Sequence, residues 1–470
     1  MESFDLVIKG GHVATASEDF TADLGIRNGV IAAIGHGLQG ARVIDATGKL
    51  VLPGGVDSHT HIEQPSPPPQ VNADTFATGS ASAAAGGTTT VICFVGQKKG
   101  GSLAEAATAY KEKAKQSRID YSFHLIITDP TQKVLEEELP PLIAEGSRSV
   151  KIFLTYEGIR LDDTEALRVL AASRKLGAIV CVHAEHHELI QHLTAELVAA
   201  GKTAPKYHAA AKPMSVEREC TARIVVLAEA LDVPIQVFHV SGADSAEEIF
   251  RGRQRGMKLW AETCTHYFVL TQDDLDRPGM EGAKFICSPA LRTKADQEAL
   301  WARVKDGTIH NVTSDHAPSR FNGPDGKLCH GPNPPFTKVP NGLTGLAARM
   351  PVMFSEGVSK GRITLQEFVA ITATNAAKLF GMFPRKGTIA VGSDADLAIW
   401  DPKRKVTITN AAMHHGSDYT PFEGMEVEGW PETTISRGVV VFENGKPTAT
   451  VGHGQFIARF PYDMIKPLNG

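Results

Sequence analysis

Eight short apolar runs, each followed by loop and helix signals, recur in the central part of this 470-residue chain. This rhythm is typical of repeated βα units on a parallel sheet. Eight units predict a closed (β/α)8 barrel over residues 53–386, while a doubly wound open sheet is the structural alternative. The predicted strands lie in the segments GGVDSHTH, TTTVICF, YSFHLII, SVKIFLT, AIVCVHA, PIQVFHV, KLWAETC and HNVTSDH.

The two ends of the chain have a different texture, with short β-runs separated by Gly and Asp. FDLVIKGGHV and ARVIDATGKLVLPG belong to residues 1–52, and DADLAIWD and ETTISRGVVVFENGK belong to residues 387–470. The dipeptide Asn444-Gly445 marks a tight hairpin turn in the second of these regions. We therefore predict that both ends form one β-sandwich domain, followed by a C-terminal tail, beside the barrel.

Composition and charge narrow the functional class. Hydrophobic residues make up 42% and charged residues 21%, which is typical of a soluble globular enzyme. The net charge of -5 comes from interspersed charges without a basic block, so we expect a small-molecule partner, no nucleic acid and no membrane. The six cysteines lack CxxC pairing and several lie in apolar runs, which predicts reduced thiols. Without a signal-peptide or membrane-span pattern, we expect a cytoplasmic protein.

Metal-ligating residue types fall near the C-terminal ends of the predicted strands, where barrel enzymes build their active sites. In the HTH sequence, His59 and His61 point to the same side of a strand because side chains alternate. Such a pair alone is a weak signal. Imidazole and carboxylate groups on several strand ends favour a divalent metal site, most simply zinc. The candidate ligands are His59, His61, Lys151, His183, His239 and Asp315.

Lys151 discriminates most sharply among possible sites, because SVKIFL places an amine inside an apolar strand. An unpaired ammonium is costly there. The amine could pair with a buried carboxylate, act as a Schiff-base nucleophile, or react with carbon dioxide to give a carbamate that bridges two metal ions. We favour the carbamate, because it turns a cation into an anion that a pair of metal ions attracts.

Three further residues are candidates for binding a substrate at the barrel mouth. Tyr156 follows the fourth strand, and its phenol could stabilise an oxyanion or merely pack as a lid. Ser288 in CSPALR and Asn341 in KVPNGL lie in polar turns, which also form for local reasons. We leave four histidines unassigned and expect two residues to lie behind the ligands. The unassigned histidines are His266, His316, His414 and His415, and the supporting residues are Glu185 and His186.

Taken together, these motifs resemble those of the amidohydrolase superfamily, and specifically the dihydropyrimidinases and hydantoinases, over nearly the whole chain. They are PGGVDSHTH, AGGTTTV, SVKIFLTYEG, CVHAE, FHVSG, AETCTHY, SPALR, SDHAP, FTKVPNG and KGTIAVGSDADLAIWDP. The resemblance implies a carboxylated Lys151 that bridges two zinc ions together with a hydroxide. It also implies tetramers, or sometimes dimers.

The resemblance also implies a role for each site residue. One metal ion would be held by His59, His61 and Asp315, and the other by His183 and His239. Asp315 would be the general base. Tyr156 would bind the carbonyl under attack, and the backbone of Ser288 and Asn341 would hold the ring amides.

Three features depart from the family pattern. His186 and His187 stand where relatives have Asn-Gly, and HAPS after Asp315 is closer to allantoinases and dihydroorotases. The stiff, Pro-rich loop EQPSPPPQVN follows His61 and should form part of the rim that selects the ring substituent.

The favoured reaction opens a 5-substituted hydantoin or a dihydropyrimidine to an N-carbamoyl amino acid. Allantoinase and cyclic imide hydrolase are the alternatives. Dihydroorotases carry an Arg shortly after HxH, where this chain has HTHIEQ, and mononuclear deaminases of the superfamily lack the lysine that corresponds to Lys151. A different class is represented by the collapsin-response mediator proteins, which are non-catalytic interaction proteins that have lost metal ligands. All six ligand positions are present here, which favours an enzyme.

Overall fold

The central part of the chain is a barrel of eight parallel strands. The computed structural model describes residues 4–468. Within them, the eight predicted strands form one parallel sheet in chain order, and a bridge between Thr60 and His316 joins the C-terminal ends of the first and last strand. The closed barrel is thus confirmed over the open sheet. Its strands are β6 (Gly55–Thr60), β7 (Thr88–Gly96), β8 (Asp120–Ile126), β9 (Ser149–Phe153), β10 (Ile179–His183), β11 (Ile235–Val237), β12 (Leu259–Cys264) and β13 (Ile309–Thr313).

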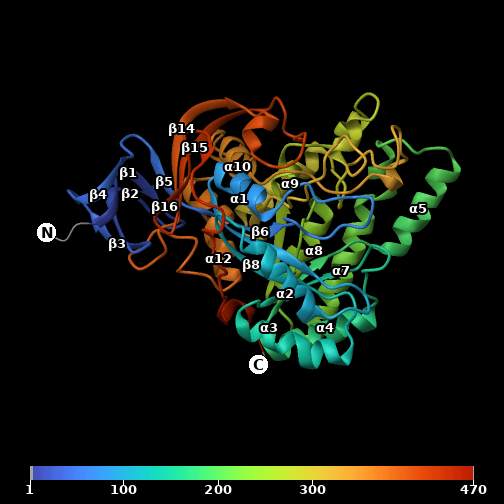
Figure 1. Cartoon of the computed structure of the whole chain (residues 1–470). Helices are drawn as coiled ribbons and strands as arrows, with labels where there is room; N and C mark the ends of the chain where they lie inside the picture. The colour runs from blue at the N-terminus through green and yellow to red at the C-terminus, as the bar shows by residue number, and fades with distance from the viewer. Residues whose placement is uncertain (1–3, 469–470) are drawn as a thin grey trace.

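Helices alternate with these strands and surround the barrel (Figure 1). Local sequence sets their limits. In the fourth helix, the Asp162 side chain accepts the Glu165 N–H as an N-cap, and Gly177 ends the helix in the left-handed conformation. The helices are α1 (Phe76–Ala85), α2 (Leu103–Ala114), α3 (Leu139–Glu145), α4 (Asp163–Leu176), α5 (His187–Ala199), α6 (Tyr207–Ala211), α7 (Met214–Leu231), α8 (Ala243–Gln254), α9 (Lys294–Lys305), α10 (Arg349–Met353), α11 (Leu365–Val369) and α12 (Asn375–Leu379).

The two chain ends meet in one nine-stranded sheet, as expected, beside the barrel (Figure 1). Antiparallel pairing of β5 with β14 joins the N-terminal strands to the C-terminal ones. Asn444 and Gly445 have positive φ between the last two strands, which confirms the hairpin turn. The strands are β1 (Phe4–Ala14), β2 (Asp19–Arg27), β3 (Val30–Gly35), β4 (Gly40–Asp45), β5 (Leu50–Pro53), β14 (Leu397–Thr407), β15 (Glu426–Ser436), β16 (Val439–Glu443) and β17 (Lys446–Pro447).

Buried charges and the C-terminal segment connect this sheet to the barrel. The Lys386 amine donates to Asp120 on β8 at 2.5 Å and to Asp396, next to β14, at 2.7 Å. After β17 the chain returns to β8, where the Ile457 N–H donates to the Tyr121 carbonyl at 2.7 Å. The domain limits at 52/53 and 386/387 stay predictions.

The six cysteines are unpaired, and all except Cys329 are buried, in agreement with reduced thiols. Among residues 4–468, no helix combines the length and the apolar character needed to cross a membrane.

Candidate active site

A cavity of about 290 Å³ lies at the C-terminal ends of the barrel strands. Its wall contains every side chain that the sequence predicted as a metal ligand or a ring-binding group. Residues from five strand ends and from three loops therefore converge on one opening, as the barrel topology requires. The predicted residues in its wall are His59, His61, Lys151, Tyr156, His183, His239, Ser288, Asp315 and Asn341.

One group of candidate ligands joins the ends of β6 and β13. The Asp315 Oδ1 atom lies 3.1 Å from His59 Nε2 and 3.2 Å from His61 Nε2. Behind them, His59 Nδ1 contacts Glu262 at 2.7 Å, and His61 Nδ1 contacts the Gln64 side-chain oxygen. These acceptors turn both Nε2 atoms towards Asp315, which is the arrangement that metal-binding histidines use.

Charges around this group favour a cation. Burial opposes the charged form of His59, but Glu262 and Asp315 outweigh it and raise the His59 pKa to about 9. Burial would likewise raise the Asp315 pKa, yet His59 and His61 hold it well below its usual value. The carboxylates thus create a negative potential at the imidazole Nε2 atoms. A divalent cation fits this donor set.

The second group of candidate ligands contains His183 at the end of β10 and His239 just after β11. Their ring centroids are 4.4 Å apart, and His239 lies 5.4 Å from the His59 ring, so the two groups are neighbours. His183 Nε2 contacts the buried Glu185 at 2.7 Å, which leaves its Nδ1 for a ligand. Burial lowers the His183 pKa to about 4, so the ring is neutral at pH 7, as metal binding requires.

Lys151 lies on β9 and is fully buried. Its Nζ atom has no hydrogen-bond partner among the described residues and lies 4.1 Å from the Phe238 ring centroid. Burial lowers the Lys151 pKa to about 8. This geometry argues against a simple pairing with a buried carboxylate, because no carboxylate of residues 4–468 contacts the amine. A buried polar atom without a partner instead indicates a missing group.

Three site residues adopt left-handed backbone conformations that side chains rarely take. The φ angles are 75° for Tyr156, 40° for His239 and 44° for Asp315. Each such residue costs on the order of 1–3 kcal/mol, and such strain clusters at functional sites. The surrounding contacts must therefore hold these residues in place.

Tyr156 lies beside His183, with their ring centroids 5.1 Å apart, and Ser288 also lines the cavity. Burial raises the Tyr156 pKa well above its usual value, so its phenol is a hydrogen-bond donor at neutral pH. The Ser288 hydroxyl accepts from the buried Lys212 amine at 2.7 Å. The same amine donates to Glu185 at 3.1 Å, so one lysine connects Ser288 to the carboxylate behind His183.

A second buried lysine fastens the loops that present Ser288 and Asn341. The Lys327 amine donates to the Ile286 carbonyl at 3.1 Å and to the Pro340 carbonyl at 2.8 Å. Burial lowers the Lys327 pKa to about 7. Because each carbonyl lies next to, or close to, a predicted ring-binding residue, Lys327 sets the separation of the two loops.

The rim of the cavity is uncharged and combines polar side chains with proline and alanine. As predicted, the Pro-rich loop after β6 forms part of it, with further residues from the chain after Asp315. No branched aliphatic side chain, methionine or tryptophan lines the cavity among the described residues. The rim is formed by Gln64, Pro65, Ser66, Pro67, Gln70, Asn72, Ala317, Pro318 and Ser319.

The residues expected behind the ligands have different positions. Glu185 contacts His183, in agreement with its supporting position. His186 instead caps α5, where its Nδ1 accepts the Leu189 N–H at 3.3 Å. It lies outside the cavity wall. Among the described residues it makes no hydrogen bond to a candidate ligand that would give it the expected supporting role.

The four unassigned histidines lie in different parts of the structure. His414 lies beside Phe442 of β16, and the buried His266 lies against Tyr267 with its ring tilted, outside the cavity wall. His316 and His415 form a second group of ligand-type atoms together with Asp74.

Sequence reasoning missed four supporting residues. Glu262 could have been found, because an acidic residue inside the apolar run KLWAETC gives the same signal as Lys151 in SVKIFL. Asp74, Lys212 and Lys327 lie in loops without such contrast. Their roles depend on contacts with segments far away in the sequence.

Comparisons with known proteins agree with this geometry. The model of the amidohydrolase family matches residues 50–441. A D-hydantoinase of Ralstonia pickettii is 45% identical over 463 residues, which cover 97% of this chain and 99% of that protein. A D-hydantoinase of Geobacillus stearothermophilus is 44% identical over 98% of this chain and 97% of its own length. The solved dihydropyrimidinase structure from Brevibacillus agri superposes with a TM-score of 0.94 at 42% identity and covers 97% of this chain and 99% of that one. This chain therefore belongs to the amidohydrolase family and, within it, to the hydantoinases and dihydropyrimidinases.

Proposed function

We propose that this protein is a metal-dependent hydrolase that opens the ring of 5-substituted hydantoins or dihydropyrimidines to N-carbamoyl amino acids. The observation that carries the proposal is the convergence of all six candidate ligands around a buried, partnerless Lys151 amine. The full-length similarity to proteins named D-hydantoinase supports the substrate class. The intact ligand set speaks for an enzyme over the non-catalytic alternative.

Two divalent cations, with zinc first among them, fit the donors of the site. His59, His61 and Asp315 would hold one, and His183 and His239 the other. Cations in such a site supply Lewis acidity and make water nucleophilic at neutral pH.

The lysine supplies the remaining donor once it is modified. The neutral Lys151 amine attacks carbon dioxide, a new N–C bond forms, and one proton leaves to give a carbamate. The lowered pKa favours this reaction, because it increases the neutral fraction of the amine at pH 7. The carbamate would offer the two cations an anionic donor where the unmodified lysine has a buried amine without a hydrogen-bond partner among the described residues.

The other side chains bind the ring and move protons. Asp315, held as a carboxylate, accepts a proton from the attacking water and passes it to the ring nitrogen as the C–N bond breaks. Tyr156 donates to the carbonyl oxygen as its negative charge develops. The backbone at Ser288 and Asn341 holds the ring amides.

The test is hydrolysis by metal-replete protein of 5-substituted hydantoins, dihydrouracil, allantoin and cyclic imides. We expect ring opening of the first two classes, loss of activity after chelation, and recovery on adding zinc, manganese or cobalt. Absence of ring opening with every substrate would overturn the proposal, and measured metal content would show whether the site itself had formed.

Three polar side chains of the rim favour a second candidate substrate. Gln70, Ser66 and Ser319 line the cavity and can hydrogen-bond an uncharged polar substituent, such as the ureido group of allantoin. A higher kcat/KM for allantoin than for 5-benzylhydantoin would assign the protein to allantoinase chemistry. The cytoplasmic location and the tetrameric or dimeric assembly stay predictions.

A further inference from the structure

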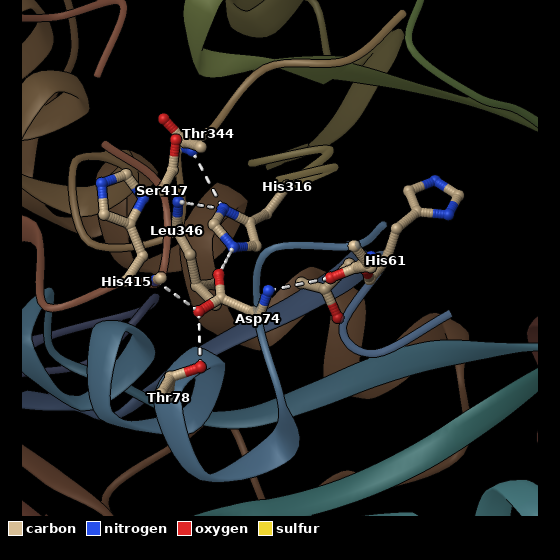
Figure 2. A network of polar contacts seen from close by, with 12 residues as sticks. His61, Asp74, Thr78, His316, Thr344, Leu346, His415 and Ser417 are labelled. Atoms are coloured by element: carbon tan, nitrogen blue, oxygen red, sulfur yellow. Dashed lines mark hydrogen bonds and ion pairs between the residues drawn. The ribbon is translucent and has the colours of Figure 1, made fainter. Parts of the chain in front are cut away.

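A buried carboxylate–imidazole pair lies just outside the cavity wall. Asp74 precedes α1, and His316 directly follows Asp315. The Asp74 Oδ2 atom is 2.7 Å from His316 Nε2, and both side chains are buried. Figure 2 shows the His316 ring between Asp74 and the chain near Leu346.

The contacts of this pair fix its protons. His316 Nδ1 accepts the backbone N–H groups of Gly345 at 3.2 Å and Leu346 at 3.4 Å, so the ring proton must be on Nε2 and is donated to Asp74. The other Asp74 oxygen accepts from the Thr78 hydroxyl at 2.6 Å and the Gly416 N–H at 2.7 Å (Figure 2). All of these polar atoms are therefore satisfied.

These hydrogen bonds argue against a further metal site formed by Asp74, His316 and His415, although their ligand atoms lie within 4.8 Å of one another. Neither His316 nitrogen has a lone pair left for an ion. The third member, His415, has its Nε2 2.8 Å from the Asn410 side-chain oxygen. Asp74 and His316 therefore hold neighbouring segments of the chain together by hydrogen bonds.

The pair is linked to the candidate ligands through the backbone. The His316 carbonyl accepts the His61 N–H at 2.7 Å, across the point where the barrel closes. The His61 carbonyl accepts from the Asn72 amide at 2.5 Å, and the Asn72 oxygen accepts the Asp74 N–H at 3.1 Å. The His61 peptide is thus held on both sides by this network.

We propose that Asp74 and His316 are positioning residues that set the backbone of His61 and Asp315, and so the geometry of one metal and of the proton acceptor. Asp315 has a left-handed backbone, which needs such support. Neither Asp74 nor His316 lines the cavity, so their effect reaches the substrate only through other residues. The inference rests on the proposed function for its kinetic readout alone.

Asp74→Asn is the main test, because it removes the charge and leaves the barrel closure at His316 untouched. We expect metal binding and kcat to fall about 10- to 100-fold, as for other residues that orient metal ligands. KM should change less than kcat, because the carbonyls beside Ser288 and Asn341 are held by Lys327 and not by Asp74. In cobalt-loaded protein, the visible absorption bands should shift, since they report ligand geometry.

Two substitutions of His316 separate the contacts of its ring. His316→Gln places an amide N–H near the former Nε2 and retains a donor for Asp74. His316→Asn instead retains only an acceptor for Gly345 and Leu346. We expect the Gln variant to be closer to wild type than the Asn variant in metal affinity, cobalt spectrum and kcat.

His415→Gln is the matched control, because it changes a half-buried histidine of the same group that does not bond Asp74, and it should behave as wild type. Wild-type kcat, metal affinity and cobalt spectrum in Asp74→Asn would overturn the proposal. So would a third equivalent of metal in the wild type that His415→Gln removes. If the wild type opened no cyclic amide, the proposed function would fail, while metal affinity and the cobalt spectrum would still decide the role of the pair.

Discussion

The two sides of the cavity are built in different ways. On the ligand side, side chains such as His59 come from strand ends, and buried carboxylates hold two of the imidazoles: Glu262 contacts His59, and Glu185 contacts His183. On the ring-binding side, Ser288 and Asn341 lie on loops, and a buried lysine, Lys327, donates to the backbone carbonyls beside them. The barrel strands position the ligand side, whereas hydrogen bonds from Lys327 to loop carbonyls position the ring-binding side.

This difference predicts different failures. Strand ends are fixed by the sheet, so a change on the ligand side should alter metal content and kcat. In the proposed mechanism the loops hold the substrate without taking part in bond breaking. A change that loosens them should therefore remove binding that is equal in the ground and transition states. Such a change raises KM and leaves kcat nearly intact.

Lys151→Met should have the largest effect. It removes the amine while keeping an apolar side chain of similar length, and it should abolish binding of both metals. We expect kcat to fall by more than the roughly 10²–10⁴-fold typical of losing one proton-transfer group. Metal analysis and steady-state kinetics measure this. Full activity with full metal content would contradict the proposed site, and retained thermal stability of the metal-free variant would exclude simple unfolding.

Tyr156→Phe should lower kcat by about 10²–10³-fold, because one donor to the developing oxyanion is lost. Metal content should stay at the wild-type level. Tyr207→Phe, outside the cavity wall, is the matched control. If Tyr156 acts only as an aromatic lid, the phenylalanine variant will retain wild-type kcat.

Glu262→Gln should weaken metal binding about 10- to 100-fold, because a neutral amide holds the His59 imidazole less strongly. Titration of the metal-free variant with zinc measures this. KM should not move. A rise in KM without a change in metal affinity would remove the contrast between the two sides.

The ligand side could be predicted from the sequence more completely than the residues that hold the loops. The strands and ligand candidates could be predicted, because hydrophobic runs locate strand ends and His, Lys or Asp in such runs is conspicuous. Lys212 and Lys327 could not, because their partners are loop carbonyls or side chains distant in the sequence. The supporting role expected for His186 is not reflected in its contacts. Being next to Glu185 in the sequence does not decide where a side chain points, and α5 begins at this position, so His186 caps the helix.

Lys327→Met should have the smallest effect and the most specific one. The substitution leaves the Ile286 and Pro340 carbonyls without their donor, so the loops bearing Ser288 and Asn341 can separate. We expect KM to rise about tenfold, equivalent to roughly 1.4 kcal/mol, with kcat and metal content close to wild type.

The exposed Lys338, on the same stretch of chain, gives the control Lys338→Met, for which no change is expected. A lower kcat at unchanged KM in Lys327→Met would place the loops in the bond-breaking step. Both sides of the cavity would then act on the transition state, and the distinction between a rigid catalytic side and a fastened binding side would fail.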